Sequence, residues 1–166
     1  MTNDEYLHKL YYDIRLRALT NRFYYQERQR IFELRDNLVR ASSLIAGSFA
    51  FVNLLNQEIL KIAIGVVTAG NALSLVFGFG AKSRDSAKRT TEWALLERDI
   101  EAKGARDYVE SDLSTWSARC NELEAGEPAP NKRLLEQSYL RACTALGSTP
   151  ETPSSRWNRL PAFFIP

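Results

Sequence analysis

The uncharged run at residues 62–81 constrains this chain more than any other feature of its sequence. A helix rises about 1.5 Å per residue, so the run extends about 30 Å as a helix, which matches the hydrocarbon thickness of a bilayer. The run contains Gly65, Gly70, Gly78 and Gly80. Each glycine costs a helix in water about 1 kcal/mol relative to alanine, whereas transmembrane helices use glycine for close packing. The run therefore favours a membrane-spanning helix over a soluble core helix.

A second uncharged run, residues 41–57, lies directly before the first. Its length is at the lower limit for crossing a bilayer, and Arg40 can extend its charge to the headgroups and lengthen the apolar part. The connection is short, and Asn56 is suited to cap the helix that follows. The two runs therefore predict a transmembrane helical hairpin, residues 41–81, with spans at about 39–56 and 59–81.

Basic residues are concentrated outside the hairpin rather than in its connection. Arg22, Arg28, Arg30, Arg35 and Arg40 precede it, Lys82, Arg84, Lys88, Arg89 and Arg98 follow it, and the connection contains only Lys61. This positive-inside pattern predicts a multi-pass membrane protein with both termini in the cytoplasm. The alternative is a soluble helical hairpin, which would not explain why basic residues are concentrated outside the hairpin rather than in its connection. We expect Arg35, Arg40, Lys82 and Arg84 to anchor the hairpin against lipid headgroups.

Composition excludes several other classes. The length of 166 residues indicates one domain. The net charge of +2 is small, and the sequence shows no basic stripe of the kind that binds nucleic acid. Cys120 and Cys143 fall on the predicted cytoplasmic side, where thiols stay reduced, and no histidine near them suggests a metal site. The apolar run at residues 41–57 follows a long charged segment, so we expect this run to act as an uncleaved insertion signal rather than a cleaved signal peptide.

The flanks predict an all-α membrane protein with a cytoplasmic helical bundle. Residues 1–40 form a long N-terminal helix without glycine or proline after its cap, and residues 82–147 form further helices. Each of these carries a narrow apolar stripe that needs a partner. The stripes are Trp93, Leu96 and Ile100; Val109, Leu113, Trp116, Cys120 and Leu123; and, in a helix capped by Asn131, Leu135, Tyr139, Ala142 and Leu146.

Residues 148–166 form a polar linker followed by the apolar segment RWNRLPAFFIP. This segment, residues 156–166, is too short and too rich in proline to span a bilayer. Three roles stay open for it: docking on the bundle, an interfacial anchor, or a peptide that binds a partner.

No catalytic site is expected. The chain lacks the common nucleotide-binding, hydrolase and zinc-protease motifs. His8 forms a solvated helix pair with Asp4, and Glu122, Glu124 and Glu127 fit a solvated helix end. We therefore predict a protein that is not an enzyme and needs no cofactor or metal.

Small and polar residues inside the hairpin are the candidate functional positions. Gly70, Ser74 and Gly78 recur every four residues and Gly47 lies in a similar ridge, so these ridges either close the hairpin on itself or pack copies together. Asn53, Thr68 and Asn71 are polar at membrane depth and must find partners or water. Pairing within the hairpin is one explanation. The other is a pore, lined by these residues, that roughly four or more copies would enclose in a homo-oligomer.

The order of elements, and the stretch LSTWSARCNELEAGEPAPNKRLL at residues 113–135, resembles the SLATT family of bacterial two-transmembrane effectors. The resemblance covers about residues 5 to 146. It implies a role in defence against phage or invading DNA, in which the protein breaches the inner membrane when a cytoplasmic sensor or signalling partner reports infection. The family has no catalytic residues to carry over. We expect no appended sensor or enzyme domain in this chain, which leaves the trigger open.

Two alternatives use the same hairpin. In the first, a non-conducting anchor or scaffold recruits a soluble partner through the stripe at residues 109–123 and the apolar segment. In the second, the chain is a phage-encoded holin or superinfection-exclusion protein.

Overall fold

The computed structural model describes residues 2–52 and 57–150, with the side chains of Val52 and Ile59 left out, and these residues form helices without any strand. The helices are α1 (Asn3–Val52), α2 (Gln57–Phe77), α3 (Phe79–Lys103), α4 (Glu110–Ala125) and α5 (Lys132–Ala145). The predicted all-α class is confirmed. Contacts divide the chain into a hairpin unit, Arg28–Asp85, and a bundle unit, Met1–Glu27 with Ser86–Pro166; α1 and α3 contribute to both.

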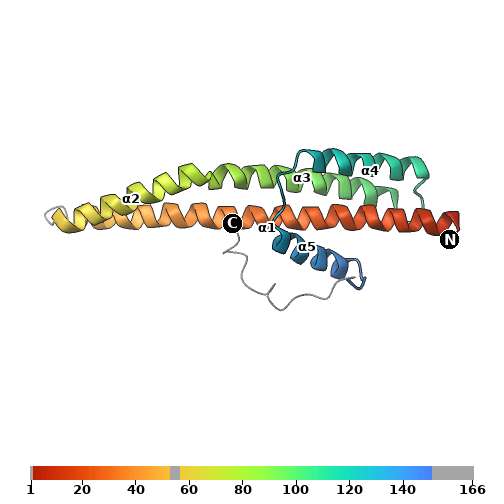
Figure 1. Ribbon diagram of the computed structural model, residues 1–166, viewed down its shortest axis with the longest axis horizontal. Coiled ribbons are helices and arrows are strands. Elements are labelled where there is room, and N and C mark those ends of the chain that lie inside the picture. Colours follow the sequence, from red (N-terminus) through yellow and green to blue (C-terminus); the bar gives the residue numbers. More distant parts are fainter. Residues whose placement is uncertain (1, 53–56, 151–166) are drawn as a thin grey trace. The chain divides into compact units, whose positions relative to one another are not determined.

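In the hairpin unit, α2 runs antiparallel beside the second half of α1 (Figure 1). Small residues form the seam between them, since Ala46 and Ala63 are buried. At Gly70 an added methyl group would lie 3.6 Å from Ser43 Oγ and 3.7 Å from Val39 Cγ1. A methyl group at Gly70 would thus make ordinary van der Waals contacts with α1, which places Gly70 in the seam between α1 and α2 of one chain.

Gly78 interrupts the helical path between α2 and α3. Its φ of +59° lies in the left-handed region, which costs any residue with a Cβ about 1–2 kcal/mol. Its N–H donates to Ser74 O at 2.9 Å and its carbonyl accepts from Lys82 N–H at 2.9 Å. A methyl group on Gly78 would meet nothing within 4 Å. Gly78 therefore marks the change of backbone conformation between α2 and α3, while both of these hydrogen bonds keep the four-residue spacing of a helix.

The bundle unit buries its apolar stripes in its own core, with α3, α4 and α5 around the first half of α1 (Figure 1). The stripe predicted on α3 is confirmed, because Trp93, Leu96 and Ile100 are buried. On α4 the residues Leu113, Trp116, Cys120 and Leu123 are buried as well. The ring of Tyr11 on α1 stacks on that of Tyr108 with 4.6 Å between centroids.

Two stripes differ from the prediction. Val109 is the residue before α4 and is 54% exposed, because Gly104, at φ +81°, ends α3 and the connecting residues are not helical. The Val109 N–H donates to the Asp112 carboxylate at 3.0 Å, which starts α4 one turn before Leu113. On α5 the buried side chains are Leu134, Ser138, Ala142 and Cys143, so the core stripe is rotated relative to the predicted one. Asn131 caps α5 as predicted, accepting from two backbone N–H groups.

The acidic residues near the end of α4 are not a freely solvated cluster. Arg17 holds Glu124 in a two-pronged ion pair, and Trp93 Nε1 donates to Glu127 Oε1 at 3.1 Å. Burial raises the pKa of Glu127 above its ordinary value of 4.5, and the hydrogen bonds from Trp93 and Tyr25 offset only part of this rise in pKa.

We expect Glu127→Gln to remove a pH-dependent loss of stability. A carboxyl whose pKa is raised on folding stabilises the fold below its unfolded pKa, and that contribution is lost as the pH rises through the folded pKa. Glutamine can still accept the Trp93 hydrogen bond. Urea unfolding followed by tryptophan fluorescence should show the variant gaining stability relative to the wild type as the pH rises from 4.5 towards neutrality. An unchanged difference across that range would contradict this.

Candidate functional site in the helical hairpin

Asp36 is the centre of a polar cluster between α1 and the helices that follow the hairpin connection. Ser74 Oγ donates to Asp36 Oδ1 at 3.1 Å, and Arg40 pairs with Asp36 Oδ2 at 2.7 Å. The Asp36 side chain is 13% exposed, whereas that of Arg40 is 71% exposed. Gly80 lies beside the carboxylate, since a methyl group there would be in van der Waals contact with Asp36 Oδ2 at 3.6 Å.

Further charged groups of the hairpin unit gather on the next turns. Ser83 Oγ donates to Glu33 Oε1 at 3.3 Å. The Phe32 ring has three cations within cation–π distance, from Arg28, Arg35 and Lys82, at 5.5, 5.9 and 5.7 Å from its centroid. Of the four residues predicted to anchor the hairpin, Arg35 and Lys82 therefore contact Phe32, Arg40 pairs with Asp36, and a methyl on Gly80 would lie 3.5 Å from Arg84.

The pairing of Asp36 with Ser74 fixes the register of the two helices. Ser74 lies well inside the uncharged run 62–81, so Asp36 and Arg40 lie beside apolar residues of α2 rather than beyond them. The sequence prediction treated Arg40 as a flanking residue because it counted along each helix separately. Asp36 and Ser74 are nearly equidistant from Asn56, and this equal spacing is the sequence signal that could have identified the cluster.

Large apolar side chains cover the outside of the hairpin. The exposed ones are Leu44, Ile45, Phe49, Phe51, Ile62, Ile64, Val66, Leu73, Leu75, Val76 and Phe77. Within the described part of the chain, one helical stretch, Leu60–Lys103, is long and apolar enough to cross a membrane; its apolar window has a mean hydropathy of 1.9 and is 6% buried. A contiguous apolar surface of this kind marks a contact with lipid or with protein.

The predicted pore-lining residues do not face the seam. Thr68 and Asn71 are exposed on α2, and Gly47 is exposed on α1 with open space where a side chain would be. Asn53 lies outside the described residues. Gly70 and Ser74 face α1 instead, so the structure separates an inner set of small residues from an outer set.

The described residues offer no metal-binding group beside the cluster. Among residues 2–52 and 57–150, no group of histidine, cysteine, aspartate and glutamate side chains is arranged to hold a metal ion. His8 lies in the bundle unit, with its Nδ1 3.4 Å from the hydroxyl of Tyr108.

The fold and this surface define a class: a helical protein with one stretch, in the part of the chain that the structure describes, that is long and apolar enough to cross a membrane. Comparison with family models, with curated protein sequences and with solved structures found no match.

Proposed function

We propose that this chain is a membrane effector whose hairpin crosses the bacterial inner membrane twice, assembles with further copies and permeabilises the membrane on activation. The observation that carries the proposal is the Asp36–Arg40 pair beside the apolar residues of α2. An ionisable side chain is costly at membrane depth and, where it occurs, commonly marks an ion pathway. A simple anchor has no use for such a pair.

The exposure of Arg40 favours an aqueous surface at the cluster. Its side chain is 71% exposed while its partner carboxylate is largely covered. In lipid an exposed guanidinium needs water or another protein group, because hydrocarbon offers no hydrogen bonds. A water-filled path between copies would hydrate the Arg40 guanidinium, at the level where polar residues of α1 lie beside apolar residues of α2.

Thr68 and Asn71 support assembly. They are three residues apart on α2, so they share one helix face, and both are exposed. Inter-helix hydrogen bonds in membranes contribute about 0.6–2 kcal/mol each, which makes a second copy a favourable partner for the Asn71 amide. The open surface at Gly47 permits close approach of a neighbouring helix.

The role in anti-phage defence, and a cytoplasmic sensor as activating partner, rest on the resemblance to the SLATT family. The scaffold alternative is weakened by one observation: Leu113, Trp116 and Leu123 are buried in their own unit and offer no free surface. Gene neighbourhood separates a host defence protein from a phage-encoded holin.

The test compares Asp36→Asn with Glu58→Gln in bacterial cells carrying a voltage-sensitive dye. Both substitutions remove one carboxylate from an ion pair of the hairpin unit, since Glu58 pairs with Lys61 at 3.0 Å. We expect wild type and Glu58→Gln to depolarise cells alike, and Asp36→Asn to slow depolarisation about tenfold, because only Asp36 lies beside the apolar part of α2.

Membrane insertion of each variant is checked by carbonate extraction. An inserted wild-type protein that leaves the potential intact at every expression level would favour the scaffold. Equal depolarisation by both variants would remove Asp36 from the pathway.

A further inference from the structure

A groove of about 550 Å³ lies in the bundle unit between α1, α4 and α5. One wall is apolar and consists of Leu16 on α1 with Leu135 and Tyr139 on α5, all of them half-buried. This groove explains why Leu135 and Tyr139 of the predicted α5 stripe are only half-buried, although Ala142 of the same stripe is in the core. Its size is in the range of about 300–1,000 Å³ that accommodates a small ligand or a few peptide side chains.

One polar side chain that lines the groove lacks a hydrogen-bond partner among the described residues. Thr20 lines it and is only 8% exposed, yet its Oγ1 has no hydrogen-bond partner among the described residues. A buried hydroxyl without a partner costs about 1–3 kcal/mol, so a bound group that satisfies it is favoured.

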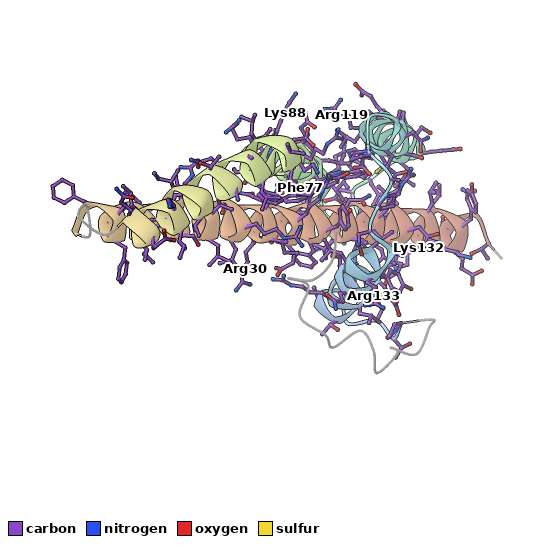
Figure 2. All side chains as sticks on the ribbon, turned by 60° about the vertical axis from the view of Figure 1, so that its left-hand side comes forward. Arg30, Phe77, Lys88, Arg119, Lys132 and Arg133 are labelled. Atoms are coloured by element: carbon purple, nitrogen blue, oxygen red, sulfur yellow. The ribbon has the colours of Figure 1, made fainter. Side chains whose placement is uncertain are left out.

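The charges around the groove are unbalanced. Glu124 is neutralised by Arg17, which leaves the carboxylates of Asp13 and Glu136 against the single ammonium of Lys132. Figure 2 shows Lys132 at the start of α5. The groove is thus apolar on one side and mildly acidic at its edge, which suits a basic peptide with large apolar side chains.

We propose that residues 156–166 of the same chain bind in this groove. The segment RWNRLPAFFIP carries Arg156 and Arg159 with no acidic residue, and Trp157, Phe163 and Phe164 are large apolar groups. It lies outside the described residues. Its arginines complement Asp13 and Glu136, its aromatic side chains fit the wall of Leu16, Leu135 and Tyr139, and its backbone can satisfy Thr20.

The connection along the chain favours this occupant over a separate partner. Leu135 is about 15 Å along α5 from the end of that helix at Ala145. The ten residues between the helix and position 156 can extend about 33 Å, so the segment reaches the groove easily. A short tether gives an effective concentration in the millimolar range, which makes a modest affinity sufficient.

The experiment uses the full chain in native membranes with benzoylphenylalanine, a photo-crosslinker, in place of Tyr139. The matched control places it at Thr144, which is on the same helix, exposed, and closer along the chain to the segment. We expect position 139 to crosslink to residues 156–166 at least about tenfold more than position 144, because the groove and not the tether holds the segment. Equal yields would overturn the proposal.

A charge exchange tests the recognition. Glu136→Arg should lower crosslinking at position 139 about tenfold, and adding Arg156→Glu with Arg159→Glu should restore it. Failure to restore the yield, in variants whose helix content matches the wild type, would overturn the proposal. Crosslinks that join light and heavy chains in an isotope-mixed sample would overturn it too, because the occupant would then be a second copy.

Discussion

Leu73→Asp should abolish stable membrane integration, and it is the most discriminating substitution for the proposed function. Leu73 is near the middle of the uncharged run and is 52% exposed on the apolar surface of the hairpin. In a bilayer an aspartate at the centre of a span costs about 2.5–3.5 kcal/mol. In water the same change at an exposed helix position costs within about 0.5 kcal/mol. Flotation of membranes with quantified protein in each fraction measures the difference.

The control is Leu95→Asp. Leu95 is a leucine of similar exposure, 45%, on the part of α3 that belongs to the bundle unit. We expect this variant to stay with the membrane fraction like the wild type. If Leu73→Asp also floats with the wild-type yield, the apolar surface is covered by protein and not by lipid, and the membrane proposal fails.

Trp93→Ala should destabilise the bundle unit by about 3–5 kcal/mol, the range for removing a buried tryptophan. Trp93 is 1% exposed and also donates its indole N–H to Glu127. Its loss therefore leaves a cavity and removes one hydrogen bond from the half-buried carboxylate of Glu127, two costs that act in the same direction. Such a loss is comparable with the whole stability of many domains.

Cys120 provides the measurement for this variant. It is fully buried, and burial raises the pKa of its thiol to about 11, so a maleimide reagent should label it only when the unit opens. We expect Trp93→Ala to accelerate labelling of Cys120 by orders of magnitude, identified by peptide mass spectrometry. Leu95→Ala, two residues away and exposed, should label at the wild-type rate. Fast labelling of the wild type would show that the core is not closed around Cys120.

Helix positions were predictable because they depend on local pattern. The apolar spacing of Trp93, Leu96 and Ile100 requires only that one face of a helix be covered, and the Asn131 cap requires only its own side chain and the next turn. The sequence predicts Val109 inside a helix, whereas α4 begins one residue later, at Glu110. The apolar spacing was extended into the connecting segment as if the helix were continuous there. The face of α5 that packs into the core was predicted wrongly, because the apolar residues that line a groove cannot be told from core residues by their composition.

The amino-acid pattern alone therefore determined that the chain is helical, where its apolar runs lie and that Trp93, Leu96 and Ile100 face the bundle core, since these follow from periodicity along one helix. Which residues face each other was decided only by the tertiary structure. The antiparallel register brings Asp36 to Ser74, and the packing of α4 and α5 against α1 forms the groove in which Thr20 Oγ1 has no hydrogen-bond partner among the described residues. These are relations between residues distant in sequence, and a repeat along a single helix does not encode them.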